Sequence, residues 1–178
     1  MDQLFYFIPA LGSVSDFMEL GGNVLVLITG LLLIMWALIF ERFIYLRGAY
    51  PSVVEQAMKT WEERSERSSW HAHMIREQLI SEVSQQLERN MPLINTCVAL
   101  APLLGLLGTV TGMIEVFQVM AVSGSGNARS MAAGVSKATV PTMAGMVAAL
   151  SGVAMQTWLT KNIDVEKEQL AEHMTTDH

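Results

Sequence analysis

A pair of long uncharged segments joined by a short polar turn constrains this chain more than any other feature. Residues 91–114 and 138–160 contain no Asp, Glu, Lys or Arg, and the pair runs from Met91 to Leu159. The hydrocarbon core of a bilayer is about 30 Å thick, and a helix needs roughly 20 apolar residues to cross it. Both segments are long enough, so the sequence predicts a transmembrane helical hairpin.

A third uncharged run precedes the hairpin. It covers residues 20–40, lies between Glu19 and Glu41, and holds Leu and Ile on all sides of a helix, a pattern typical of a span that faces lipid. The chain is 51% hydrophobic and only 16% charged. We therefore expect an all-α membrane protein whose three transmembrane helices extend into the cytoplasm.

The basic residues predict the orientation of these spans. Seven of the eleven lie in residues 41–90, none lies before Arg42, and the turn of the hairpin has only Arg129. Because Lys and Arg concentrate in cytoplasmic loops, we expect a periplasmic N-terminus without a cleaved signal. The expected segments are a periplasmic part (1–19, with a surface helix starting near Asp16), a first span (20–44), a cytoplasmic helical insert (45–90), a second span (91–122), a periplasmic loop (123–130), a third span (131–160) and a cytoplasmic tail (161–178).

Small residues recur at helical spacing along both helices of the hairpin. The first helix carries Ala101, Gly105, Gly108 and Gly112, and the second carries Ala138, Thr142, Gly145, Ala149 and Gly152. Membrane helices associate through close backbone approach and interhelical hydrogen bonds, which small residues allow. The two stripes predict tight helix packing, either within one subunit or between copies.

Two threonines place hydroxyl groups near the middle of the hairpin. Thr109 lies at the edge of the first stripe and Thr142 lies within the second. One interpretation is that these hydroxyls contact water or an ion along a pathway. The alternative is that each threonine bonds back to a carbonyl of its own helix. The sequence leaves both open.

Glu115 and Lys137 are the charges inside the hairpin. Glu115 lies six residues after Thr109 and Lys137 five before Thr142, so in antiparallel helices both sit about 9 Å and 7.5 Å from the threonine level, on the same side. They are close enough in depth to form a bridge. Each is also turned more than about 100° from its threonine, so the charged face and the threonine face are distinct. Such charges are either functional or an interfacial pair that snorkels to water.

The insert between the first two spans reads as two amphipathic helices broken near Ser68 and Ser69. Their expected apolar faces are Val53, Val54, Ala57, Met58 and Trp61 on the first, and Met74, Ile75, Leu79, Val83 and Leu87 on the second. His71 and His73 are two residues apart and point to different faces of a helix, so we expect no metal. The single cysteine, Cys97, fits core packing.

Several functional classes are excluded by the sequence. The net charge of −6 provides no basic footprint for nucleic acid. No nucleophile elbow, phosphate-binding loop, dinucleotide fingerprint or zinc-protease motif occurs, so we expect neither an enzyme nor a cofactor. Three helices are also too few for a pore of their own, and a pathway would need several copies or copies with a partner.

The hairpin resembles a known family at specific residues. The string APLLGLLGTVTGMIEVF, followed by GVSKATVPTMAGMVAAL, is similar to the MotA/TolQ/ExbB proton-channel family, and the three-span layout resembles a compact ExbB. The resemblance implies a ring-forming homopentamer in the bacterial inner membrane. Its second and third helices would enclose an ExbD-type single-span dimer, with Thr109 and Thr142 facing the partner's protonatable Asp.

The same resemblance implies the physiological role. The complex would use the proton-motive force to act through a TonB-type protein on outer-membrane receptors that import iron-siderophore or haem compounds. This chain departs from common members at Lys137, where many carry a carboxylate, and at Pro141 and Ser151. Lys137 argues against a proton-carrying carboxylate in the third helix and favours a structural bridge to Glu115. The alternatives are a TolQ-like subunit for envelope integrity, a flagellar stator, which usually has four spans, and a passive membrane scaffold.

Overall fold

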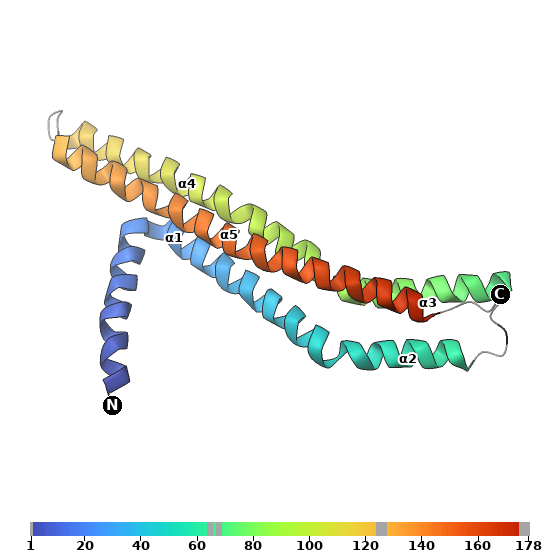
Figure 1. The fold of residues 1–178 in the computed structure, drawn as a ribbon. Coiled ribbons are helices and arrows are strands. Elements are labelled where there is room, and N and C mark those ends of the chain that lie inside the picture. Colours follow the sequence, from blue (N-terminus) through green and yellow to red (C-terminus); the bar gives the residue numbers. More distant parts are fainter. Residues whose placement is uncertain (1, 64–65, 67–68, 124–127, 175–178) are drawn as a thin grey trace. The chain divides into compact units, whose positions relative to one another are not determined.

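The protein is all-helical in the residues that the structure, a computed structural model, describes: 2–63, 66, 69–123 and 128–174 (Figure 1). The elements are α1 (Asp2–Gly48), α2 (Tyr50–Glu62), α3 (Trp70–Glu88), α4 (Met91–Ser123) and α5 (Ala128–His173). Three stretches are long and apolar enough to cross a membrane, namely Gly22–Gly48, Trp70–Val122 and Met131–His173. The fold therefore agrees with the expected all-α membrane protein. Most of the expected periplasmic loop, residues 124–127, lies outside the described residues.

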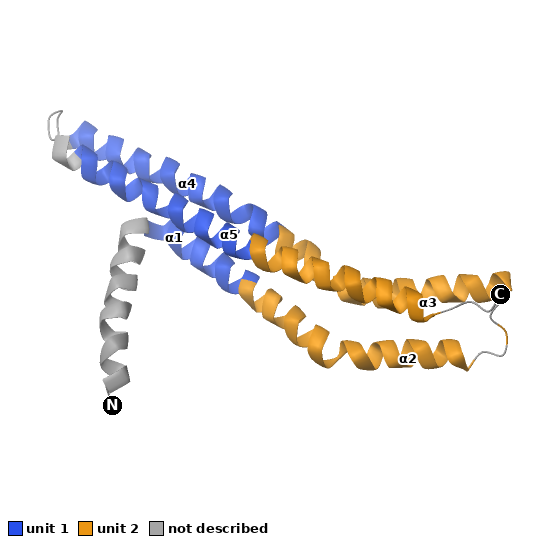
Figure 2. Ribbon diagram, in the orientation of Figure 1, with its two compact units in different colours: residues 1–35, 96–152 blue, residues 36–95, 153–178 orange. Residues whose placement is uncertain are grey.

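The chain divides into two compact units, drawn in different colours in Figure 2. Unit 1 contains Met1–Met35 and Thr96–Gly152, and unit 2 contains Trp36–Asn95 and Val153–His178. In unit 1 the hairpin helices pack on one face of α1. Its core consists of Ile28, Ala101, Ala148 and Ala149, surrounded by Val24, Leu31, Leu32, Leu104 and Ala144.

Helix α1 begins earlier than the sequence suggested. We expected a surface helix to start near Asp16, whereas helical backbone already runs from Asp2. It is interrupted at Gly22, whose φ of 62° and ψ of −160° lie outside the helical region. A residue with a Cβ rarely adopts this φ, so glycine permits the break between the N-terminal part and the first span.

In unit 2 the α2–α3 connection matches the expected break. Pro51 occupies the first turn of α2, where its missing N–H costs no helical bond. Ser69 caps α3 by accepting a hydrogen bond of 3.3 Å from the N–H of Ala72. Ser68, the other residue predicted at this break, lies outside the described residues.

The C-terminal part of α5 is held by polar contacts from α3. The Arg76 guanidinium donates to the carbonyls of Ala171 and Met174, each at 2.6 Å, and so caps the C-terminal end of α5. Lys167 forms an ion pair with Glu88. These contacts fasten the last turns of α5, and the Met174 side chain is fully buried.

The sequence interpretation is wrong for Met74, which was expected on the buried apolar face of α3. Met74 is 50% exposed, whereas Val83 and Leu87 are buried. Nine residues separate Met74 from Val83, which places them on opposite sides of a helix at 100° per residue. The buried face of α3 instead includes Ala72, whose exposure is 0%.

Candidate functional site

Helices α4 and α5 approach each other most closely at glycines, within unit 1. A Cβ added to Gly145 would lie 2.5 Å from the backbone oxygen of Ala101, and one added to Gly105 would lie 3.0 Å from the Cα of Thr142. The first distance is shorter than real Cβ contacts, and the second is tighter than most of them. The two backbones therefore touch along this line, the geometry by which membrane helices gain packing energy without a hydrophobic driving force.

The same contact line continues toward the turn of the hairpin. A Cβ on Gly108 would lie 2.3 Å from the Cβ of Pro141, and one on Gly112 would lie 3.0 Å from the Cα of Ala138. Ala138 is 3% exposed and Ala149, nearer the other end, is 9% exposed. Pro141 is thus seated against Gly108. The sequence marks this proline only as a departure from common members of the family and gives no signal for its packing on α4.

Thr142 uses its hydroxyl to join the two helices. The Oγ1 atom donates a hydrogen bond of 3.0 Å to the carbonyl oxygen of Gly105 in a partly buried position. In a regular helix that carbonyl also accepts the N–H of Thr109, one turn away. The two predicted threonines therefore lie at neighbouring levels of the α4–α5 contact.

Thr109 behaves differently. Its hydroxyl donates to the carbonyl of Leu106 in its own helix at 2.6 Å and is solvent-exposed within the single chain. Thr109 therefore bonds back to its own helix, which is one of the two alternatives that the sequence left open, whereas Thr142 follows neither and bonds across to α4. Contact of either hydroxyl with water or an ion stays a prediction. A hydroxyl that donates to its own helix still has acceptor lone pairs free. Thr109 can therefore accept a hydrogen bond from a donor on another molecule.

The charged residues belong to a different surface of unit 1. A cavity of about 570 Å³ lies between the start of the first span and the parts of α4 and α5 nearest the turn that joins them. Its lining includes Glu115, Lys137, Thr111 and Asn23. In the described part of the chain, neither Thr109 nor Thr142 belongs to this lining. Thr111 and Glu115 share a helix face because they are four residues apart.

Glu115 and Lys137 face this common cavity, and both side chains are exposed. Among the described residues no ion pair within 4.0 Å joins them. The bridge between the two stays a prediction. The sequence interpretation missed Asn23 and Thr111 as neighbours of these charges. Thr111 could have been found, because it lies four residues before Glu115 and so on the same helix face.

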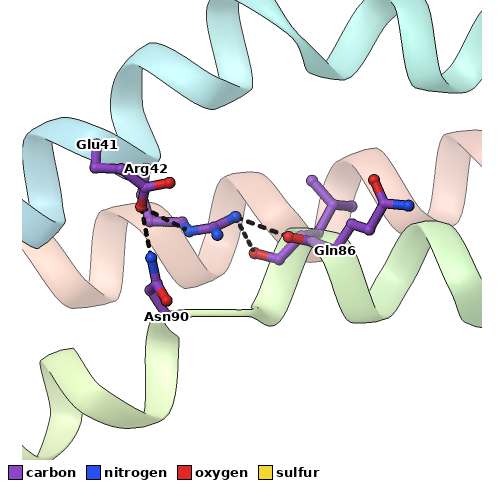
Figure 3. Close-up of polar contacts among 5 residues, drawn as sticks. Glu41, Arg42, Gln86 and Asn90 are labelled. Carbon is purple, nitrogen blue, oxygen red and sulfur yellow. Dashed lines mark hydrogen bonds and ion pairs between the residues drawn. The ribbon is translucent and has the colours of Figure 1, made fainter.

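A buried arginine forms a second polar cluster, in unit 2 (Figure 3). Arg42 of α1 is 2% exposed and donates from Nη1 to the carbonyls of Gln86 at 2.7 Å and Leu87 at 3.4 Å. Its Nε lies 3.3 Å from Glu41 Oε2, and the same carboxylate oxygen accepts a hydrogen bond of 2.8 Å from Asn90. Arg42 thus caps the C-terminal end of α3 at the point where α4 is about to begin.

No group of three or more His, Cys, Asp or Glu in the described ranges is arranged to hold a metal ion. The long apolar helices, the glycine contact line and the interhelical threonine bond together define an integral membrane protein of the all-α class. The packing of its hairpin places the hydroxyl of Thr142 and the carbonyl of Gly105 at the α4–α5 contact.

Comparison with known proteins identifies the family. The family model described as "MotA/TolQ/ExbB proton channel family" matches residues 48–172, so the chain belongs to that family of membrane proton channels, which is not an enzyme class. This confirms the resemblance read from the hairpin sequence.

Individual relatives are similar over part of their length. A "Putative biopolymer transport protein ExbB-like 1" of Synechocystis sp. is 44% identical over 68 residues, 36% of this chain and 27% of that protein. A "Biopolymer transport protein ExbB" of Helicobacter pylori is 31% identical over 90 residues, 51% of this chain and 62% of that protein. The chain thus spans less than two thirds of each of these relatives.

Proposed function

We propose that the chain is an ExbB-type subunit of a proton-driven motor in the bacterial inner membrane. Copies form a ring, by family resemblance a pentamer, in which α4 and α5 enclose the single-span helices of an ExbD-type dimer. The observation that supports this most directly is the hydrogen bond from Thr142 to the carbonyl of Gly105, because Gly105 lies one helical turn from Thr109.

The chemistry required of this level is modest. A carboxylate on the partner's helix must take up a proton from the periplasmic side and release it toward the cytoplasm. Isolated charges in a bilayer are costly, so hydroxyl groups that can both donate and accept stabilise the charged form while it is exposed to the wall. Thr109 and Thr142 provide these groups. Each hydroxyl can accept from the protonated carboxyl as it stands, and each donates to the carboxylate once its proton turns away from the Leu106 or Gly105 carbonyl. The proton-motive force drives the rearrangement.

The output of the motor would pass through a TonB-type protein to outer-membrane receptors for iron-siderophore or haem compounds. The names of the relatives, which are ExbB-like biopolymer transport proteins, favour this role over the TolQ-like one. The proposed orientation has the N-terminus in the periplasm and the C-terminus in the cytoplasm, as the distribution of basic residues predicts.

The test is proton flux through the purified complex in vesicles. The chain is co-expressed with its ExbD-type partner, and the stoichiometry of the complex is measured by native mass spectrometry. Thr109→Val and Thr142→Val remove a hydroxyl while keeping the side-chain shape, and both should abolish flux in an assembled complex. Thr111→Val is the matched control, because Thr111 bonds within α4 as Thr109 does, to the carbonyls of Leu107 and Gly108, but lines the charged cavity instead of the level of Thr109 and Thr142.

Four outcomes would contradict the proposal. A wild-type chain that purifies as a lone monomer would rule out the proposed ring. Flux that survives both Thr109→Val and Thr142→Val would rule out the proposed role of the threonines. An assembled complex with no flux at all would favour a passive scaffold, and a deletion that weakens the envelope without affecting uptake would favour the TolQ-like function.

A further inference from the structure

An aromatic and cationic cluster joins α1 and α5 in unit 2. The rings of Phe43 and Trp158 lie 5.8 Å apart, centroid to centroid, at an angle of 35°. The guanidinium carbon of Arg47 lies 4.4 Å from the centre of the Phe43 ring. Trp158 remains 44% exposed. Exposed Trp at the end of a membrane span is typical of the boundary between lipid tails and headgroups.

Two cations extend from this aromatic pair in the same direction along their helices. Arg47 follows Phe43 by four residues and Lys161 follows Trp158 by three, so each lies about one turn further along, on the same face as its aromatic neighbour. Lys161 is the first charge after the uncharged run of α5. Arg47 is the first exposed cation after the run of α1, because Arg42 before it is buried. Each exposed cation therefore lies just beyond the uncharged run of its own helix.

The two cations also lack a counter-ion within the described residues. Neither Arg47 nor Lys161 forms an ion pair there, whereas Lys167 pairs with Glu88 and Lys59 with Glu63. The sequence places no carboxylate in residues 42–54 or 138–163, and Asp164, three residues after Lys161, forms no ion pair with it among the described residues. In a chain of net charge −6, this is a local positive patch at the end of two spans, with an apolar ring surface directly beside it.

We propose that Arg47 and Lys161 bind the phosphate of an anionic phospholipid in the cytoplasmic leaflet, with the acyl chains packed along Phe43 and Trp158. The inference rests on the membrane orientation of the proposed function. Charge complementarity selects the occupant, because anionic lipids give that leaflet a negative surface and each basic residue near it gains attraction. The aromatic pair adds contact with acyl chains, which a soluble phosphate ion does not have.

The experiment measures which lipids stay with the full-length chain. Protein extracted in detergent is incubated with equal amounts of phosphatidylglycerol and phosphatidylcholine, and the ratio of bound lipids is read by native mass spectrometry. The double variant R47Q/K161Q should lower this ratio roughly thirtyfold, given the attraction expected for two basic residues. Lys59→Gln removes one cation from an exposed side chain on α2 and should leave the ratio unchanged.

Further variants keep the test decisive. The charge-preserving variant R47K/K161R should restore the ratio, which separates a headgroup contact from a folding defect, and Trp158→Leu should lower retention of both lipids. An unchanged ratio in R47Q/K161Q would overturn the proposal. Equal stabilisation of the protein by millimolar inorganic phosphate and by phosphatidylglycerol would indicate a free-anion site and would also overturn it. Thr142→Val should not alter lipid retention, so failure of the proton-flux test and failure of this one are distinguishable.

Discussion

The hydroxyl of Thr142 on α5 donates a hydrogen bond of 3.0 Å to the carbonyl oxygen of Gly105 on α4. This bond can form because Gly105 has no side chain: a Cβ there would lie 3.0 Å from the Cα of Thr142 and from the carbonyl oxygen of Pro141. The close approach that small residues permit is thus also what brings a hydroxyl of one helix within reach of the backbone of the other.

The threonine pair predicts a separation of stability from transport. Thr142→Val should lower the free energy of unfolding by about 1 kcal/mol, because it removes an interhelical hydrogen bond in an apolar setting. Thr109→Val should change it much less, since the hydroxyl bonds only to its own helix. Both variants should nevertheless lose proton flux. Thermal unfolding in detergent measures the first effect, and equal destabilisation by the two variants would contradict the geometry.

The glycine contact line predicts a large cost for one methyl group. Gly145→Ala would place a Cβ 2.5 Å from the Ala101 carbonyl, and the helices must separate to relieve it. Overpacking of this kind costs about 1–3 kcal/mol. Gly30→Ala is the matched control, because nothing lies within 4 Å of its added Cβ, and alanine there should be neutral or stabilising through helix propensity. Unfolding midpoints that move together in the two variants would refute the packing argument.

The buried arginine of α1 predicts a further loss of stability. Arg42→Met removes the donors to the Gln86 and Leu87 carbonyls and should cost about 2–4 kcal/mol, because buried acceptors lose charged partners. Arg42→Lys should recover part of this, since lysine keeps the charge but not the planar fork. Hydrogen exchange at residues 84–90 should rise in Arg42→Met. As a control, Lys59→Met affects a 75% exposed side chain and should cost a few tenths of a kcal/mol at most.

Tyr50 predicts an alkaline loss of stability. Burial of its phenol, and next the nearby Glu166 carboxylate, raise the pKa of Tyr50 from 10.0 to about 12. Below about pH 10 both folded and unfolded states are protonated, so nothing changes. Between about pH 10 and 12 the unfolded state loses the proton first, and stability should fall by at most about 1.4 kcal/mol per pH unit.

The measurement for Tyr50 is the alkaline end of a stability profile together with tyrosinate absorbance. Tyr50→Phe should remove both the late titration and the corresponding fall in stability. Glu166→Gln should lower the pKa of Tyr50 only in part, since burial is the larger cause. A profile that is identical in wild type and Tyr50→Phe up to pH 12 would show that burial of this phenol is lost before it titrates.

The sequence predicted the elements of this structure better than their partners. Uncharged runs and small-residue spacing indicated three spans and a closely packed hairpin because both follow from one helix at a time. The acceptor chosen by Thr142 could not be derived in this way, since a carbonyl of its own helix and one of α4 are chemically equivalent until the register between the helices is known. Arg42 illustrates the same limit: in sequence it simply ends a span, and its partners at Gln86 and Leu87 are more than 40 residues away.

The face of α3 shows how a pattern misleads. Met74 is adjacent to Ile75 and is apolar, so it was included in the buried stripe, yet it is 50% exposed. A search for apolar periodicity favours large apolar side chains and gives little weight to a small residue such as alanine. Ala72 has 0% exposure and sets the true direction of the face, because a methyl group permits closer approach than a long flexible thioether.

Pro141, seated against Gly108, has a mechanical consequence for α5. Its ring nitrogen carries no hydrogen, so the carbonyl one turn earlier, at Lys137, has no helical donor and the helix is held by one bond fewer at this level. Bending at this level therefore breaks no hydrogen bond between Pro141 and the Lys137 carbonyl, because none is formed. Any tilt that a bound helix imposes on α5 should therefore concentrate in the single turn from 137 to 141, directly beside Thr142, and leave the rest of this helix straight.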